Sequence, residues 1–279
     1  MDAYTFHPIA EICSGNRYRF EAPRQAAYAH NEAFVRFLPD SRYAVASEDL
    51  VGFDRIWLIF CFHLNLGAGW KPKVRPPVTP DGGRYSLFAT RSPHRPNPIG
   101  MSCVELRSIG RDGLHIGPCD LLDGTPVLDI KPYLPEADAF PDSRAGWRDR
   151  VVPLLWRVSW EPPALEKAGW ILDRIGLDLP SFAELQLGCR PFDRRRKRVH
   201  SLDAGEGLYA IGCRTWQLPF RADPGTRNIR VTNLLSHYTP EELAEGTSDP
   251  YGDKAIHREF LLRFPDSRWP RPVGEAPSL

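Results

Sequence analysis

A proline-rich segment at positions 88–100 constrains the fold of this chain of 279 residues more than any other part. It reads Phe-Ala-Thr-Arg-Ser-Pro-His-Arg-Pro-Asn-Pro-Ile-Gly. Proline fixes its own φ, lacks a backbone donor and pushes the preceding residue toward extended geometry. The segment therefore predicts a stiff loop and excludes a helix or a central strand. Polar side chains held on a rigid loop are typical of binding sites, and here they are Arg91, His94, Arg95 and Asn97.

A second informative segment begins at Asp120 and ends at Tyr133. Asp123-Gly124 is a turn signal, and the alternation that follows it predicts a strand. In such a strand Leu128 and Ile130 are buried, whereas Asp129 and Lys131 share the opposite face. These two charges form either a structural ion pair on a solvated face or part of a site. The polar residues just before them, Asp120, Asp123 and Thr125, favour a site.

Composition narrows the class of protein. The chain is 42% hydrophobic and 25% charged, and no apolar run is long enough to span a bilayer. The N-terminus lacks the pattern of a signal peptide. Six scattered cysteines without a Cys-x-x-Cys pair argue against zinc or disulfides and fit a reducing compartment. We therefore expect a cytoplasmic protein with no metal and no membrane segment.

Arginine dominates the basic residues, although the formal net charge is only +1. Of the 36 basic residues just six are lysines, and one cluster reads Arg194-Arg195-Arg196-Lys197-Arg198. Arginine suits planar contacts with phosphates and bases. A run of this kind is usually a solvated loop, and it becomes a phosphate-binding candidate only if other features point to RNA.

Many short strands separated by turns predict a barrel or a sandwich. The apolar run Arg55–Phe62 reads as a buried strand, and Gly110–Gly113 as the turn of a hairpin. Val151–Trp160 reads as a last strand before the break at Glu161-Pro-Pro-Ala. We therefore predict a mainly β fold, with a small single β-barrel domain over residues 1–164 and a smaller α+β appendage over residues 165–279.

Several of these segments together resemble the TsaA-like family, whose characterised members are tRNA N6-methyltransferases. The matching elements, in order over roughly residues 6–140, are Pro23-Arg24-Gln25, the run Gly52–His63, Val74-Arg75-Pro76-Pro77 and the two segments described above. The resemblance implies a β-barrel that binds S-adenosylmethionine and acts as a homodimer. It also implies methyl transfer to N6 of threonylcarbamoyladenosine at position 37, in the anticodon loop of a tRNA.

The resemblance also assigns residues to the site. The donor-binding positions that it implies are Pro23, Arg24, Gln25, His63, Leu64, Arg91, Met101, Asp123, Gly124, Thr125 and Pro126. The candidates for contact with RNA are His94, Arg95, Asn97, Lys131, Arg190, Arg194, Arg195 and Arg196. The chain departs from the family pattern at Leu64, commonly Gln, and at His94, commonly Phe. Of the family's C-terminal Asp-Pro-Arg-Pro element, only Arg190 and Pro191 are present.

Methyl transfer to nitrogen depends mainly on holding the reacting atoms in line. The N–H of a carbamoylated N6 is more acidic than that of plain adenine, so a nearby acceptor could take its proton. Asp129 and Tyr133 are the candidates. Two alternatives stay open: a non-catalytic barrel that binds RNA or S-adenosylmethionine, and a methyltransferase with another acceptor. The sequence contains no His-Glu-x-x-His motif of a metal-dependent hydrolase and no Gly-x-Ser-x-Gly motif of a serine hydrolase.

Overall fold

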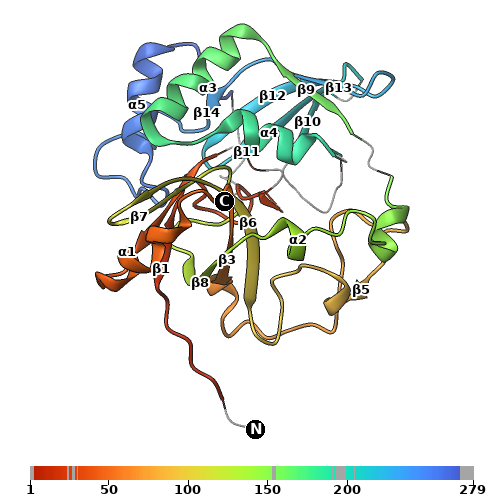
Figure 1. The fold of residues 1–279 in the computed structure, drawn as a ribbon. Helices are drawn as coiled ribbons and strands as arrows, with labels where there is room; N and C mark the ends of the chain where they lie inside the picture. The colour runs from red at the N-terminus through yellow and green to blue at the C-terminus, as the bar shows by residue number, and fades with distance from the viewer. Residues whose placement is uncertain are drawn as a thin grey trace. The chain divides into compact units, whose positions relative to one another are not determined.

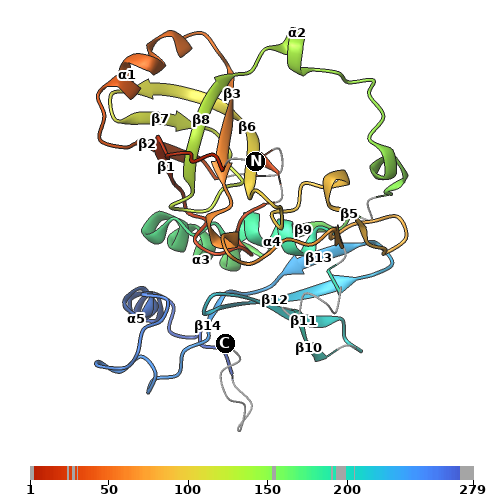
Figure 2. The ribbon, with the colours of Figure 1, turned by 90° about the horizontal axis from the view of Figure 1, so that it is seen from below.

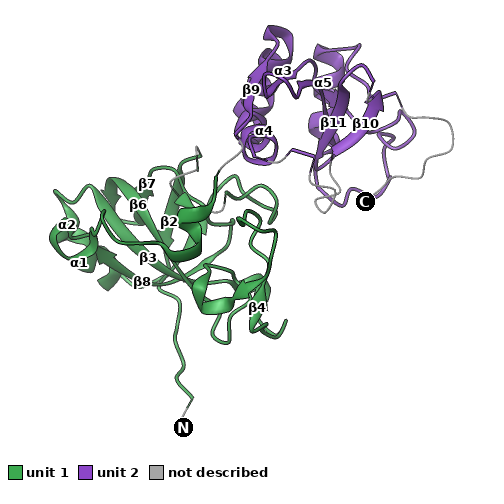
Figure 3. Ribbon diagram, turned by 90° about the vertical axis from the view of Figure 1, so that its right-hand side faces the viewer, with its two compact units in different colours: residues 1–153 green, residues 154–279 purple. Residues whose placement is uncertain are grey.

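The computed structural model describes residues 3–23, 25, 26, 29, 31–152, 155–189, 191, 192, 199–203 and 205–270. The chain divides into two compact units, residues 1–153 and 154–279, drawn green and purple in Figure 3. Among the described residues, no helix has both the length and the apolar character needed to cross a bilayer.

The first unit is a closed antiparallel barrel, and the mainly β prediction is confirmed (Figure 1). Its strands are β1 (Ala10–Cys13), β2 (Ala33–Phe37), β3 (Arg55–Cys61), β6 (Ile99–Gly110), β7 (Gly113–Ile116) and β8 (Pro126–Pro132). They close in the order β1-β2-β7-β6-β3-β8. The additional elements are α1 (Arg42–Ser47), the two-stranded ribbon of β4 (Lys73–Val74) and β5 (Tyr85–Ser86), and α2 (Pro135–Asp138).

Alternation along β3 explains why the barrel closes. Ile56, Leu58 and Phe60 point into the core and are 0–3% exposed, whereas Trp57 and Ile59 between them face outward. A strand with one buried face needs partners on both edges, and β3 has β6 and β8. The predicted strand at Arg55–Phe62 and the predicted hairpin of β6 and β7 are both confirmed.

The predicted alternation along β8 is wrong in its first half. Val127, expected on the solvated face, is fully buried in the core, and Leu128 is only partly buried. The cause is a β-bulge: Ile59 pairs with Asp129 but Phe60 pairs with Val127, which leaves Leu128 as an extra residue. A bulge shifts the side-chain parity by one, so that Val127 and Ile130 both face inward.

Four segments meet at one end of the barrel because of the strand directions. Strands β6 and β8 both run antiparallel to β3, so they begin where β3 ends. Strand β1 runs antiparallel to β8 and ends at the same place. The described segments that leave or enter the barrel here are residues 14–23, 25, 26, 62–66, 90–98 and 117–125. We call this region the loop end.

The second unit is a sheet with helices on one side (Figure 2). The sheet order is β10 (Val199–Asp203), β11 (Leu208–Cys213), β12 (Trp216–Asp223), β13 (Asn228–Val231) and β9 (Arg157–Trp160), and β14 (Leu235–Ser236) also pairs with β12. The helices are α3 (Pro162–Ile175), α4 (Leu179–Leu187) and α5 (Lys254–Arg263). Trp216 of β12 packs against Phe260 of α5, which contacts Trp170 of α3.

The sequence predicts that the strand before Glu161 belongs to the barrel. The structure shows instead that this strand, β9, belongs to the sheet of the second unit. It pairs in parallel with β13, with Val158 opposite Ile229 and Trp160 opposite Val231. These apolar pairs lie on the covered face of the sheet, and Pro162 then begins α3 at once. A sequence reading cannot tell which sheet a lone apolar strand joins, because the partner strand lies about 70 residues further along.

Candidate active site at one end of the barrel

Hydrogen bonds tie the acidic turn to the end of β1. The Asn16 side chain donates to the carbonyls of Cys119 and Leu121, both at 3.3 Å. The backbone N–H of Ser14 donates to Asp123 Oδ1 at 3.0 Å. Gly124 sits at the turn with φ +71°, a conformation that a side chain would strain. Residues 119–125 are thus fixed against β1 before β8 begins.

Arg91 and Asp120 join three segments of the loop end. The Arg91 guanidinium donates to Gln25 Oε1, and its charge also acts on the carboxylate of Asp120. Asp120 accepts a hydrogen bond from Ser102 Oγ at 2.8 Å and another from the backbone of Ala26. A predicted donor-site turn, the proline-rich loop and the acidic loop therefore converge around Arg91 and Asp120.

Burial raises the pKa of Asp120, although its hydrogen bonds and Arg91 act in the opposite direction. A raised folded-state pKa means that folding favours the protonated form. The contribution of Asp120 to stability is therefore complete at low pH, and is lost as the pH rises from its ordinary pKa, about 4, through the raised value.

Asp120→Asn should remove this pH dependence while keeping an acceptor for Ser102. The free energy of unfolding of the variant, relative to the wild type, should increase as the pH rises above about 4 and then level off. Denaturant unfolding of the barrel between acidic and neutral pH measures this difference. A difference that is the same at every pH would contradict the assignment.

His63 and Leu64 follow β3 directly, in a single 3-10 turn. Burial and the nearby charge of Arg19 lower the pKa of His63, which favours the neutral imidazole. Arg19 also donates to the carbonyl of Leu64, whose side chain is 47% exposed. Neutral His63 and exposed Leu64 thus offer a polar and an apolar surface side by side.

The proline-rich segment is the braced loop that the sequence predicts, with no helix or strand between residues 90 and 98. Arg95 donates to the carbonyl of Thr90 at 3.0 Å and lies over the ring of Phe88. His94 Nδ1 lies 3.2 Å from the Asn65 side chain. Asn97 is exposed. Arg95 and His94 therefore brace the loop. Both side chains are only partly buried, so part of each remains accessible at the surface.

Asp129 and Met101 lie on the outer face of the barrel, on the two strands that flank β3. Ile59 pairs with Asp129 on one side and with Met101 on the other, so the two flank one residue of β3. Two strand spacings separate their backbones by roughly 10 Å. Asp129 is ion-paired with Lys131 at 2.8 Å, and Met101 is 55% exposed.

Tyr133 is not brought to the loop end. It follows the far end of β8 and packs against Trp57, with ring centroids 5.9 Å apart. Seven strand residues separate it from the start of β8, which corresponds to roughly 20 Å. Within one chain, the structure therefore places Asp129 nearer to the loop end than Tyr133.

Some candidate residues lie outside the described part of the chain. They are Arg24, Arg190, Arg194, Arg195 and Arg196. Within the described part, no group of three or more His, Cys, Asp or Glu side chains is arranged to hold a metal ion, and the six cysteines are free thiols.

Three supporting residues were missed by the sequence analysis: Asn16, Arg19 and Ser102. Asn16 anchors the acidic loop, Arg19 fixes Leu64 and Ser102 binds Asp120. Ser102 follows directly after Met101, which is the only sequence signal that could have found it. Asn16 and Arg19 act across more than 40 residues of chain, so no local pattern reveals them.

The barrel matches a family model described as the tRNA-methyltransferase O N-terminal domain over residues 12–139. A tRNA (adenine(37)-N6)-methyltransferase of Eikenella corrodens is 50% identical over 182 residues, which cover 64% of this chain and 96% of that protein. The enzyme of the same name from Escherichia coli strain K12 is 41% identical over 152 residues, covering 53% of this chain and 65% of that protein.

The match to a solved structure extends beyond the barrel. A crystal structure of TrmO from Pseudomonas aeruginosa superposes with a TM-score of 0.62 at 30% sequence identity, and the alignment covers 84% of this chain and 99% of that one. Both the barrel and part of the second unit must be included to reach this coverage. The chain therefore belongs to the tRNA-methyltransferase O family.

Proposed function

We propose that this protein methylates N6 of threonylcarbamoyladenosine at position 37 of a tRNA. As a member of its family it is an S-adenosylmethionine-dependent tRNA (adenine-N6)-methyltransferase. Our proposal goes beyond this family activity in one respect, which is that the acceptor adenosine carries a threonylcarbamoyl group. The convergence of Arg91, Asp120 and exposed apolar side chains at the loop end supports binding of the methyl donor, and the family resemblance over roughly residues 6–140 supports the acceptor.

The residues present at the loop end fit the methyl donor. S-adenosylmethionine has a carboxylate, two cationic centres, a ribose and an adenine, so its site needs cationic, anionic and apolar surfaces. Arg91 is exposed and suits the carboxylate, and Asp120 supplies negative charge beside it. Met101 and Leu64 are 55% and 47% exposed and offer apolar surface for the adenine. Asp123 is exposed and accepts a hydrogen bond from Ser14 through one oxygen, and its carboxylate suits a ribose hydroxyl.

When bound, the cofactor supplies an electrophilic methyl group on a sulfonium. The protein's part is to hold that methyl in line with N6 and to exclude other orientations. Gln25 holds Arg91, and the braced proline-rich loop fixes the side of the site that carries His94, whose planar ring can stack on a base. Asp129 is the proposed proton acceptor, and it forms an ion pair with Lys131 at 2.8 Å.

Asp129→Asn should lower the single-turnover rate by at least about tenfold while leaving donor affinity unchanged, because an amide cannot accept the proton. The measurement is rapid-quench methyl transfer with saturating donor, accompanied by calorimetry. Glu136→Gln is the matched control, since Glu136 is an exposed carboxylate of the same unit, on α2 beyond the far end of β8. An unchanged rate in Asp129→Asn would leave this residue as half of a structural ion pair.

The acceptor is tested by methyl incorporation into two otherwise identical tRNAs, one with and one without the threonylcarbamoyl group at position 37. The proposal predicts incorporation only into the modified tRNA, at N6. Equal incorporation into both tRNAs would contradict the proposed acceptor. Donor binding without transfer to either would indicate a non-catalytic binding barrel.

We also propose a homodimer in the cytoplasm. One small barrel has little surface with which to cover both the donor and an anticodon loop, and Ile99 and Met101 expose apolar surface beside the loop end. Free thiols at all six cysteines fit a reducing compartment, where tRNA is modified. Light scattering of the purified protein measures the oligomeric state.

A further inference from the structure

Arginines gather on the open face of the sheet in the second unit. Along β12, the buried residues Leu218, Phe220 and Ala222 face the helices, whereas Arg221 and Asp223 are exposed on the other side. Strand β13 repeats this alternation, with Arg230 exposed between buried neighbours. The helix-free side of this sheet is therefore a polar surface near the turn that joins β12 to β13.

Strand register brings three of the arginines together. Arg221 lies directly opposite Arg230, and Arg230 lies opposite Ser159. Arg157 is two residues before Ser159 and so points to the same face. Three neighbouring strands span roughly 10 Å, which places these guanidiniums within reach of one ligand.

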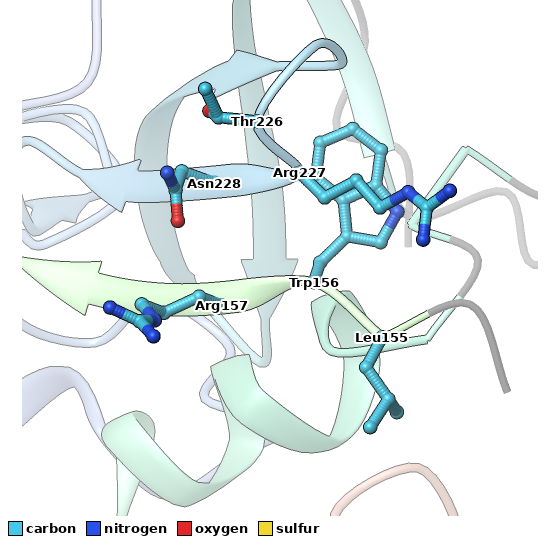
Figure 4. A pocket seen from close by; sticks show the side chains of 6 residues that line it. All are labelled: Leu155, Trp156, Arg157, Thr226, Arg227 and Asn228. Atoms are coloured by element: carbon cyan, nitrogen blue, oxygen red, sulfur yellow. The ribbon is translucent and has the colours of Figure 1, made fainter.

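A fourth arginine, Arg227, stands in the turn between β12 and β13. Together with Arg157 it lines an open depression of about 710 Å³ whose other lining residues are Leu155, Trp156, Thr226 and Asn228 (Figure 4). Figure 4 shows the Arg227 side chain extending past the indole of Trp156. We call Arg157, Arg221, Arg227 and Arg230 the arginine face.

The described carboxylates of the second unit do not neutralise the arginine face. Like charges directly opposite each other on neighbouring strands destabilise a sheet. Across the part of the second unit that the structure describes, no carboxylate forms an ion pair with these four side chains. The acid closest in register, Asp223, is held by the turn, where it accepts hydrogen bonds from Gly225 and Thr226. An anion from another molecule would relieve the repulsion that the sheet retains.

We propose that the arginine face binds the phosphate backbone of the tRNA, an inference that rests on the proposed function. Guanidiniums bind phosphates through paired hydrogen bonds and are less strongly hydrated than lysine ammonium groups. A flat row of them suits a chain of phosphates better than it suits a single small anion. The depression beside Trp156 adds a concave edge for a ribose or a phosphate.

Arg227 permits a clean test because its backbone is left-handed, with φ +53°. Asparagine adopts this conformation more readily than arginine, so Arg227→Asn removes the charge without straining the turn. Arg214 has nearly the same φ, +52°, and stands before the other end of β12. Arg214→Asn is therefore a control that is matched in backbone conformation. Arg157→Gln and Arg230→Gln keep their positions polar and remove two further charges.

The experiment measures tRNA affinity as a function of salt concentration for the wild type, Arg214→Asn, Arg227→Asn and the triple variant R157Q/R227N/R230Q. At low salt the triple variant should bind roughly 10- to 100-fold more weakly. Its plot of log affinity against log salt should be shallower by about 2 to 3, or nearly one per lost phosphate contact. Arg214→Asn and the donor affinity of all variants should stay at wild-type values.

The possible failures can be separated. A triple variant that methylates tRNA and keeps the wild-type salt slope overturns the arginine face but leaves the proposed function intact, and the face then belongs to another partner such as an acidic protein. A wild-type protein that binds the donor but neither binds nor methylates tRNA overturns both. Unchanged donor affinity and an unchanged circular dichroism spectrum in the triple variant show that lost binding is not lost folding.

Discussion

Replacing Arg91 by alanine should weaken S-adenosylmethionine binding by roughly 10- to 100-fold, because a hydrogen bond to a charged group contributes about 1.5–3 kcal/mol. The guanidinium is held in place by Gln25, so its orientation costs little on binding. Its removal also leaves the buried carboxylate of Asp120 without its nearest counter-charge, which should raise the pKa of Asp120 further. Isothermal titration calorimetry measures the loss of affinity.

Arg111→Ala is the control for this experiment. Arg111 is exposed in the turn between β6 and β7, and β6 runs from the loop end to the other end of the barrel. It has the same charge and belongs to the same unit, but it is remote from Arg91. Equal affinities for wild type and Arg91→Ala would remove Arg91 from the donor site, whereas equal losses in both variants would point to a long-range effect of charge.

Leu58→Ala should lower the free energy of unfolding of the barrel by about 2–5 kcal/mol. Leu58 is fully buried on the inner face of β3, where it pairs with Ser102 and Ile130 of the two neighbouring strands. The loss combines the removed apolar surface with the cavity left behind, which closely paired strands cannot fill. Hydrogen exchange should show lost protection in the barrel strands, with little change in the second unit.

Val45→Ala provides the comparison for Leu58→Ala. Val45 is 65% exposed on α1, and a substitution at such a position usually changes stability by less than about 0.5 kcal/mol. A loss below about 1 kcal/mol for Leu58→Ala would mean that β3 is not the packed centre of the barrel. Loss of protection in both units would instead mean that the two units unfold as one.

The barrel was predictable because its signals are local. The short apolar run of β3 and the Gly110–Gly113 turn of the hairpin can each be read within a dozen residues. The bulge at Leu128 could not be predicted, because it depends on the register of β8 against β3. The same holds for β9, whose partner β13 is distant in sequence. Helix α5 was not predicted, because its sequence has no strong helical repeat of apolar residues. Its buried face is defined by the contacts of Phe260 with Trp216 and Trp170.

The candidate site was predictable in its residue types but not in its contacts. Family resemblance pointed to Gln25, Arg91 and Asp123, and the structure places all three at the loop end. The burial of Asp120 and its bond to Ser102 arise only when β6 and the acidic loop pack together. The arginine face likewise appears only in the register of three strands, because Arg157 lies 64 residues before Arg221.

The most direct test of the whole account is a crystal structure of the protein with S-adenosylmethionine bound. The account predicts the cofactor at the loop end of the barrel, with its carboxylate at Arg91 and its adenine against Met101. A cofactor found in the depression between Leu155 and Asn228 of the second unit, or on any surface away from residues 14–26 and 90–101, would contradict it.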